Sequence, residues 1–404
     1  MVNHLPARIA CAAIGIVLIT GCQRKGLQEL VRDDLFSIQL GKMEDQMDLF
    51  QIDGAPQEHQ TSVFMRDGQF YIANGSSAKV MTFTSYGDLI SLIYNPATNP
   101  QPMLLTPRVS GDTVSTRSSV KFPFKDIGKI VVSSDSTLYV EDDVPDGKGV
   151  LDEKTGAWLG RVILRFDRLG NPTGYIGQEG VGGTPFPVIV GLSMTNRDQL
   201  VVVSRLPDYS WLAFWYSKDG ALLYQISIDP RNLPTEKGVI PSLMEVIPDM
   251  KDPVLYLMIQ YFKETIDPAT HQQSSMENYA SRVYTLSLKT GTYQSFVQLP
   301  TNPPRKEKSG FTTTEIPAPP NDLLGVSGNG FYYLLGFTDS NLYTLTILDA
   351  SGRVRSRRYM VIEDSELLFR DVKLAPTGLV YGLLCNSDKA WTSWWRSDLL
   401  LKGD

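Results

Sequence analysis

A strand–loop–strand unit that recurs along the chain constrains the fold of this sequence more than any other feature. In each copy a short strand with an aromatic or large aliphatic centre leads through a variable loop to a second strand, which ends in a turn closing on Gly. The five best copies begin at residues 69, 138, 200, 255 and 331. Because short β-branched and aromatic runs alternate with turn residues throughout, the sequence predicts an all-β chain.

The turn that closes each unit has a defined chemistry. Four of the five copies read aromatic or Leu, then Asp, Ser or Thr, two residues, and Gly, whereas the copy beginning at residue 255 reads as one residue shorter. An Asp such as Asp167 or Asp349 can bind its own backbone two residues on, and Gly takes the positive φ that closes the hairpin. These Asp residues are predicted to form turns, with ligand binding as the alternative.

A sixth, imperfect copy predicts how the chain closes on itself. Residues 379–383 and 391–401 supply two strands, after which the chain ends. The strand-like segment Leu35–Leu40 has no unit of its own, so we expect it to complete the last blade and remove a free sheet edge. Together the units predict a six-bladed β-propeller over residues 34–404. Its Pro-, Ser- and charge-rich insertions are residues 95–127, 142–160, 263–280 and 300–321.

The N-terminus has the pattern of an export signal. Arg8 precedes the apolar run Ile9–Thr20, which is too short to cross a bilayer and fits the apolar region of a signal peptide. The run ends in Leu-Ile-Thr-Gly-Cys at Leu18–Cys22, which resembles the bacterial lipobox. That resemblance implies a signal peptide of residues 1–21, acyl chains such as palmitate on Cys22, and a tether of residues 22–33. An uncleaved signal anchor with an incidental Cys is the alternative.

The body of the chain is similar in strand–turn style to NHL-type six-bladed propellers. The whole chain resembles the uncharacterised β-propeller lipoproteins of spirochaetes, on the strength of its repeat style and the lipobox at Cys22. The resemblance implies a protein of the bacterial cell envelope, attached to a membrane through lipid on Cys22, on the periplasmic side or at the cell surface. A flexible tether of this length spans about 17–20 Å, which keeps the body close to the membrane.

Composition disfavours several classes of function. The formal net charge is −6, and an acidic chain without a long basic run is a poor candidate for binding nucleic acid. The three His residues are His4, in the signal segment, and His59 and His271, in polar, loop-like sequence. They disfavour a Ser-His-Asp hydrolase or a His-ligated metal site. The sequence therefore predicts no enzyme, no catalytic or metal-ligating residue, and no cofactor.

Two groups of residues near the C-terminus are candidates for a contact surface. Trp394 and Trp395 alternate across one strand, so one is predicted to fill the space between blades and the other to be partly exposed. Arg355 and Arg357 belong to a basic strand edge, interpreted as a solvated face that blunts edge pairing. Contact of this edge with anionic headgroups is the alternative.

The acidic insertion and the remaining cysteine are interpreted as structural. Asp142, Asp143, Asp146 and Asp152 do not have the spacing of an EF-hand and are expected in a solvated loop, with a Ca²⁺ site as the alternative. Cys385 would lack a disulfide partner if Cys22 carries lipid, and its apolar neighbours predict a small buried hydrophobic residue.

Two functions compete on these grounds. A non-catalytic scaffold that binds a protein partner in the envelope is favoured, because a propeller offers two broad loop faces and the lipid places them at a membrane. A ligand-binding or metal-dependent, lactonase-like hydrolase that uses the central channel is the alternative. The innermost strands are expected to make the channel apolar, with Glu245 and Lys373 as exceptions. Carboxylates that converge in the channel would favour the alternative.

Overall fold

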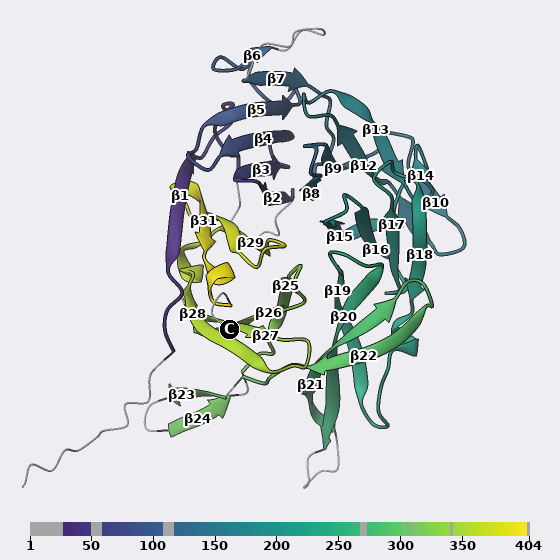
Figure 1. Ribbon diagram of the computed structural model, residues 1–404, viewed down its shortest axis with the longest axis vertical. Coiled ribbons are helices and arrows are strands. Elements are labelled where there is room, and N and C mark those ends of the chain that lie inside the picture. Colours follow the sequence, from purple (N-terminus) through teal and green to yellow (C-terminus); the bar gives the residue numbers. More distant parts are fainter. Residues whose placement is uncertain are drawn as a thin grey trace, which may run out of the picture.

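The computed structural model is all-β and describes most of the chain. The described residues are 27–49, 59–107, 117–266, 273–302, 304–309, 312–316, 318–339 and 342–401. Six antiparallel sheets are arranged as blades around a central axis, so the predicted six-bladed β-propeller is confirmed (Figure 1). None of the described residues forms a helix with the length and hydropathy that a membrane crossing requires.

Each blade has four principal strands, numbered below in order from the axis outwards. Blade 1 holds β2 (Thr61–Arg66), β3 (Gln69–Asn74), β4 (Lys79–Thr84) and β5 (Leu89–Tyr94); blade 2 holds β8 (Ile130–Val132), β9 (Leu138–Asp143), β12 (Arg161–Phe166) and β13 (Pro172–Gly177); blade 3 holds β15 (Val188–Met194), β16 (Leu200–Arg205), β17 (Trp211–Tyr216) and β18 (Leu222–Ile228). Blade 4 holds β19 (Ile240–Pro248), β20 (Val254–Ile266), β21 (Gln273–Ser287) and β22 (Thr292–Gln298); blade 5 holds β25 (Asp322–Val326), β26 (Tyr332–Asp339), β27 (Leu342–Leu348) and β28 (Val354–Val361); blade 6 holds β29 (Phe369–Leu374), β30 (Val380–Cys385), β31 (Lys389–Trp395) and β1 (Arg32–Gln39).

Blade 6 is closed by the N-terminal strand, as the sequence predicts. β1 pairs antiparallel with β31, from Arg32 opposite Trp395 to Gln39 opposite Lys389. Pairing begins before β1, because Glu29 forms a parallel bridge with Tyr359 on β28 of blade 5. Residues 28–33, placed in the tether by sequence, therefore already lie against the rim of the propeller.

The turns between the third and fourth strands follow the predicted chemistry. The Asp167 carboxylate accepts hydrogen bonds from the backbone N–H groups of Leu169 and Asn171, both at 2.8 Å. Gly170 then has a φ of 82°, in the left-handed region that glycine tolerates. In blade 4 the closing N–H of Gly291 bonds the carbonyl of Ser287, four residues earlier rather than three. That turn is one residue longer than the others, and reading it as shorter was wrong.

The core lies between neighbouring blades, because each sheet buries both faces. Between blades 3 and 4, for example, Trp215 packs in one cluster with Leu257 and Leu286. Cys385 is fully buried among aliphatic side chains, as predicted, and burial raises the pKa of its thiol to about 11. Side chains of the middle strands are thus used for packing, and the ends and innermost edges of the blades remain for function.

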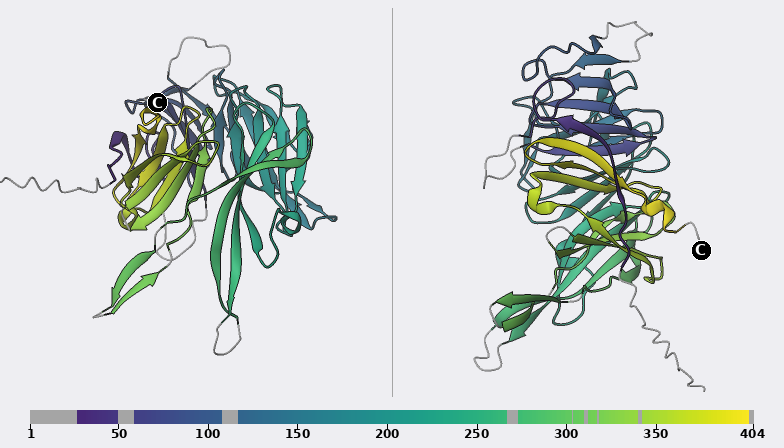
Figure 2. Two further views of the ribbon diagram at one scale, coloured as in Figure 1. Left: turned by 60° about the horizontal axis from the view of Figure 1, so that its bottom comes forward. Right: turned by 90° about the vertical axis from the view of Figure 1, so that its left-hand side faces the viewer.

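The insertions extend one face of the disc. We call the face where the innermost strands begin the upper face, and the face where they end the lower face. Three insertions form β-structure at the upper ends of strands: a hairpin of β10 (Val150–Asp152) and β11 (Ala157–Leu159), the long outer half of β20–β21, and a hairpin of β23 (Arg305–Ser309) and β24 (Thr312–Ile316). Figure 2 shows β20–β21 and β23–β24 projecting to the same side of the disc.

The remaining elements are short. β6 (Thr106–Pro107) and β7 (Ser118–Lys121) pair parallel on the rim of blade 1, and β14 (Gly180–Val181) extends blade 2. The 3₁₀ turns are η1 (Pro230–Asn232), η2 (Asp364–Glu366) and η3 (Ser397–Leu399).

Candidate functional site

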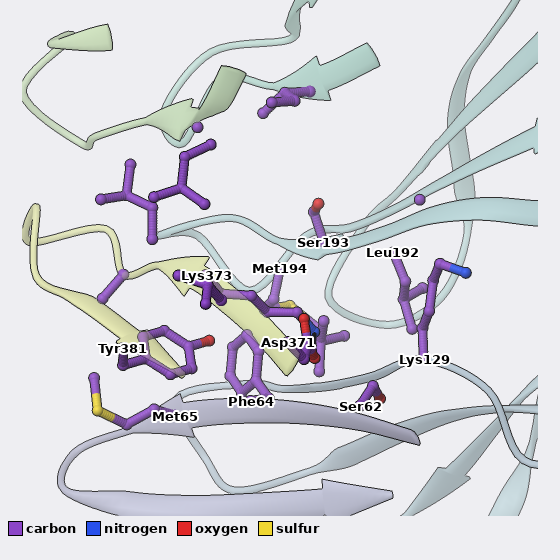
Figure 3. A pocket seen from close by; sticks show the side chains of 18 of the residues that line it. Ser62, Phe64, Met65, Lys129, Leu192, Ser193, Met194, Asp371, Lys373 and Tyr381 are labelled. Carbon is purple, nitrogen blue, oxygen red and sulfur yellow. Dashed lines mark ion pairs between the residues drawn. The ribbon is translucent and has the colours of Figure 1, made fainter. Parts of the chain in front are cut away.

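The innermost strands enclose a central channel. Its cavity has a volume of about 860 Å³ and is lined by side chains and strand edges of all six blades. Figure 3 shows Asp371 and Lys373 of blade 6 beside Phe64 of blade 1 and Met194 of blade 3, with Lys129 of blade 2 farther along. An innermost strand has one unpaired backbone edge, and in a propeller that edge faces the channel.

Two channel side chains pair with the exposed backbone edge of blade 1. The Asp371 carboxylate accepts a hydrogen bond from the Val63 N–H at 2.9 Å, and the Lys373 ammonium donates to the Val63 carbonyl at 2.8 Å. Asp371 and Lys373 also form an ion pair at 3.1 Å. This pair therefore joins the last blade to the first across the point where the ring closes.

Two other cationic side chains donate to backbone carbonyls at other junctions between neighbouring blades. The Lys129 ammonium donates to the Ile189 carbonyl of blade 3 at 3.0 Å, and the Arg66 guanidinium donates to the Val132 carbonyl of blade 2 at 2.8 Å. Carbonyls in a channel of limited water need such donors, since a buried unpaired polar group is costly. Much of the channel charge is thus structural.

Glu245 and Asp322 behave differently from these charges. Neither carboxylate has a hydrogen bond or ion pair with any other side chain in the described part of the chain. Solvent reaches both, but the surrounding strands limit hydration, so burial raises the pKa of each carboxyl group. The charge of Asp322 raises the pKa of Glu245 further, while Lys129 lowers it. Two carboxylates from blades 4 and 5 therefore share one region of the channel.

The expectation of an apolar channel was wrong in part. The valines and isoleucines of the innermost strands largely pack between blades, as Val132 does in the cluster between blades 1 and 2. Charged side chains reach the channel instead, and Glu245 and Lys373 are joined there by Lys129, Asp322, Arg370 and Asp371. The physical reason is that an innermost strand meets the channel edge-on, so its alternating side chains point towards the two neighbouring blades.

A second polar cluster lies at the upper end of blade 2 and centres on Arg161. Its guanidinium bonds the carboxylates of Glu141 at 2.9 Å, Asp126 at 3.0 Å and Asp143 at 2.6 Å. Asp126 in turn bonds the ring of His59, with Nδ1 and Oδ1 3.1 Å apart. His59 is therefore a partner in an ion-pair network.

Asp142 belongs to the same region but binds backbone groups. Its carboxylate accepts hydrogen bonds from the N–H groups of Lys125 and Asp126 at 3.1 and 2.7 Å, and only 2% of the residue is exposed. Burial raises the pKa of Asp142 to about 6, despite these donors. The effect of burial on this carboxyl group is therefore larger than that of its backbone donors.

The acidic insertion is not the solvated loop that the sequence suggested. Asp142 and Asp143 end strand β9 and are held by backbone groups and by Arg161, whereas Asp146 is exposed and Asp152 is half-buried. Within the described residues, no three His, Cys, Asp or Glu side chains are grouped as ligands for a metal ion. Arg161 pairs with Asp143 and Lys125 pairs with Asp146, whereas Asp142 is bound by backbone N–H groups.

Nine exposed apolar side chains of the described residues lie on the upper face. They lie at strand beginnings, in the β16–β17 loop and on the projecting hairpins, and they are Val150, Leu151, Trp158, Val188, Tyr209, Ile240, Met276, Tyr279 and Leu368. The lower face has fewer, with Tyr86, Val181, Val354 and Leu399 as examples. Concentrated exposed apolar surface marks interaction sites in soluble proteins.

Trp158 is the largest of these side chains and is held in place by two glycines. It is 62% exposed and pairs across the β10–β11 hairpin with Leu151. The ring packs so closely that a Cβ on Gly149 would lie 2.2 Å from ring atom Cζ2, and one on Gly160 would lie 2.7 Å from Nε1. The hairpin backbone therefore packs closely against the indole of Trp158 and leaves most of the side chain exposed to solvent.

The residues predicted to form a contact surface are only partly at the surface. Trp395 is fully buried, so it cannot contribute; Trp394 is half-buried, and its Nε1 donates to Asp33 at 3.2 Å. Arg355 is exposed, and Arg357 is half-buried and donates to the Thr346 hydroxyl at 3.1 Å. Cys22 lies outside the described residues.

A second cavity opens at the lower face, with a volume of about 720 Å³. It shares Asn196, Pro376 and Thr377 with the channel, and Trp394 forms part of its wall. Trp394 is therefore a lining residue of the lower channel mouth.

Comparison with known proteins finds only distant structural similarities. No family model and no curated protein matches the sequence. Among solved structures, the chain is similar to the Dos1 propeller, at 11% identity over 91% of this chain and 95% of that chain, with a TM-score of 0.38. It is also similar to an ulvan lyase (8% identity, 89% and 94% covered, TM-score 0.41) and to the β-propeller domain of the Trilobed protease from Pyrococcus furiosus (8% identity, 83% and 95% covered, TM-score 0.38).

Proposed function

We propose that this protein is a lipid-anchored, non-catalytic scaffold of the bacterial cell envelope, which binds a protein partner through the upper face of its propeller. The observation that carries the proposal is the set of exposed apolar side chains on that face, together with the three β-structured insertions that extend it. Protein interfaces are centred on buried aromatic and aliphatic anchors, and Trp158 is well placed as one because its ring is already fixed.

The polar groups of the molecule support a non-catalytic role. His59 and Asp126 belong to the Arg161 network, and Asp371 and Lys373 bind the backbone of a neighbouring blade. These groups are held by structural partners, which leaves them poorly placed to transfer protons to a substrate. A scaffold needs rigidity, and such interblade bonds supply it.

The location in the envelope rests on the N-terminal sequence. We propose that the chain is cut before Cys22, that acyl chains are attached there, and that it belongs with the spirochaete propeller lipoproteins it resembles. Metabolic labelling with a palmitate analogue should mark the wild-type chain and fail to mark Cys22→Ser. Equal labelling of the two chains, or release of both from membranes by salt alone, would refute the anchor.

Site-specific photocrosslinking in cells tests the scaffold. A photoreactive residue at Leu151, Tyr209 or Met276 on the upper face should capture a discrete protein, and one at Tyr86 or Val181 on the lower face should not. Trp158→Ala should reduce capture at least tenfold, whereas Tyr86→Ala should leave it unchanged. Equal capture from both faces, or capture that is indifferent to Trp158, would contradict the proposal.

A ligand-binding channel is the second candidate, favoured by one observation. Glu245 and Asp322 project into the channel without side-chain partners among the described residues, beside the cation Lys129. Such a pair suits a ligand with a positively charged group. In a thermal-shift screen of amines and amino acids, a binder should stabilise the wild type and not Glu245→Gln. The absence of any ligand that distinguishes these two chains would leave the scaffold as the better account.

A further inference from the structure

The place where the N-terminal strand joins blade 6 carries exposed aliphatic side chains. Val31, one residue before β1, is 67% exposed, and Leu27 is 39% exposed. Leu399, in the 3₁₀ turn after β31, is 48% exposed. We call these three residues the rim patch. Single exposed aliphatic residues are ordinary on protein surfaces. The rim patch is informative because Leu27 and Val31 lie close in the chain to Cys22.

The structure brings the two segments of the rim patch together. Arg32 at the start of β1 lies opposite Trp395 at the end of β31, so Val31 and the turn that holds Leu399 leave blade 6 at the same end. Leu30, which is buried, packs in one cluster with Leu400 and Leu401. The segments before and after blade 6 therefore pack together and form one piece of surface at this end of the blade.

This piece of surface lies towards the lower side of the disc. Trp395 pairs with Val380, and Val380 pairs with Leu374, the residue at which the innermost strand of blade 6 ends. In Figure 2 the beginning of β1 and the C-terminal end lie on the side opposite the β20–β21 and β23–β24 hairpins. The rim patch and the apolar upper face thus point in different directions.

Covalent geometry limits how far the rim patch can be from an anchor. Five Cα–Cα steps separate Cys22 from Leu27, and each spans at most about 3.6 Å, which gives a maximum of about 18 Å. Acyl chains on Cys22 lie in the membrane, so Leu27 stays within that distance of the headgroup layer. Val31 and Leu399 are then held beside a lipid surface at a high effective concentration.

Charges around the rim patch do not oppose such a contact. Arg32 binds Glu363 at 2.7 Å and Arg396 binds Asp398 at 2.9 Å, so both arginines are neutralised locally. Glu29 and Asp33 add negative charge on the same segment, and Arg355, Arg357 and Arg358 on the neighbouring strand β28, with Arg353 just before it, add positive charge. Charges of both signs thus surround the rim patch, and its exposed aliphatic side chains supply the apolar contact.

We infer that the rim patch of Leu27, Val31 and Leu399 is a second membrane contact, which inserts into the headgroup boundary beside the lipid anchor. The inference rests on the proposed attachment at Cys22. The disc then stands on the lower rim of blade 6, and its upper face, with the channel mouth and the projecting hairpins, is turned away from the bilayer. The lipid fixes the location of the protein, and the rim patch fixes its orientation.

The test uses the full lipidated chain in vesicles of phosphatidylcholine and phosphatidylglycerol that contain a nitroxide-labelled lipid. A polarity-sensitive fluorophore is placed at Val31→Cys, and the matched control is Val150→Cys, also an exposed valine but on the upper face. Cys385 is fully buried with a raised thiol pKa, so it does not compete for the label. We expect quenching by the nitroxide to be at least threefold stronger at position 31 than at position 150.

Three outcomes distinguish failure of the rim contact from failure of the lipid anchor at Cys22. Membrane binding unchanged in Cys22→Ser removes the anchor, and with it the proposed location. Anchored protein with equal quenching at positions 31 and 150 overturns the rim contact and leaves the anchor standing. A blue-shifted label at position 31 that is insensitive to the nitroxide but depends on protein concentration assigns the rim patch to a second copy of the chain, which also overturns the inference.

Discussion

At the scale of single residues, buried carboxylates set how stability depends on pH. Asp142 is the clearest case, because its pKa is raised from 3.8 to about 6 by burial. A raised carboxyl pKa means that the folded state favours the protonated form. This contribution to stability is complete below the unfolded pKa and is lost as pH rises through 6.

Replacing Asp142 by Asn should remove that dependence. A difference of about two pKa units corresponds to about 3 kcal/mol, so the wild type should lose up to this amount, relative to Asp142→Asn, between pH 4 and pH 7. Urea unfolding of both chains at several pH values measures the difference. Asp146→Asn, at an exposed side chain, is the control and should follow the wild type. Parallel curves for Asp142→Asn and the wild type would contradict the assignment.

The positive charge of Arg161 balances the negative charges of its three carboxylate partners. Removal of one partner from a buried ion pair leaves an uncompensated charge and typically costs about 3–5 kcal/mol. Arg161→Met should therefore lower the free energy of unfolding by about that amount at neutral pH. Arg231→Met breaks an exposed pair with Asp229 and should have little effect. Equal effects in chemical denaturation would show that the network is not stabilising.

At the scale of elements, the strands were predictable because their signals are local. An aromatic-centred strand and a turn such as Asp167–Gly170 are defined within a few residues, and both were found where expected. The β10–β11 and β23–β24 hairpins were missed, because their polar, Pro-rich surroundings are typical of loops. The Arg161 network was missed because its partners, Asp126 and Glu141, come from different segments that only the fold brings together.

The side chains that line the channel could be predicted from the sequence only in part. Alternation along a strand predicts two faces, and the sequence alone does not say that both faces of an innermost strand meet other blades. Register irregularities near Val190, Met244 and Leu324 shift the alternation further. Asp322 was therefore not recognised as a channel residue, although Glu245 and Lys373 were.

Strand β1 gives an element-scale prediction. Ile38 is 2% exposed and packs in the cluster between blades 6 and 1, whereas the neighbouring Ser37 points to solvent. Ile38→Ala should cost about 2–5 kcal/mol, and Ser37→Ala should stay within about 0.5 kcal/mol. Thermal and urea unfolding measure both. Should Ile38→Ala match Ser37→Ala, β1 would not be an integral strand of blade 6.

At the scale of the whole molecule, the ring is closed twice at the junction of blades 6 and 1. β1 completes blade 6 at the rim, and Asp371 and Lys373 bind the Val63 backbone at the axis. Both closures are non-covalent and both join residues distant in sequence. The first and last parts of the chain must therefore meet before either closure contributes to stability.

Two carboxylates in the same channel allow the inner closure to be measured. Asp371→Ala leaves the buried Val63 N–H without its acceptor and should cost about 1–3 kcal/mol. Asp322→Ala removes a carboxylate that has no side-chain partner among the described residues and whose pKa is already raised, so stability at neutral pH should be unchanged or slightly higher. Denaturant titrations of the two chains, side by side, give the answer. Equal destabilisation would mean that channel charge as a whole, rather than the bond to Val63, holds the ring.

Strand β1 has one more consequence, which is mechanical. The proposed anchor at Cys22 would be joined covalently to the folded body through the segment that enters β1, so a pull between a partner and the membrane would be transmitted along this strand. The same hydrogen bonds that close blade 6 then carry the load. Whichever is weaker under load, the lipid anchor or the pairing of β1 with β31, then determines whether the protein leaves the membrane or its ring opens first.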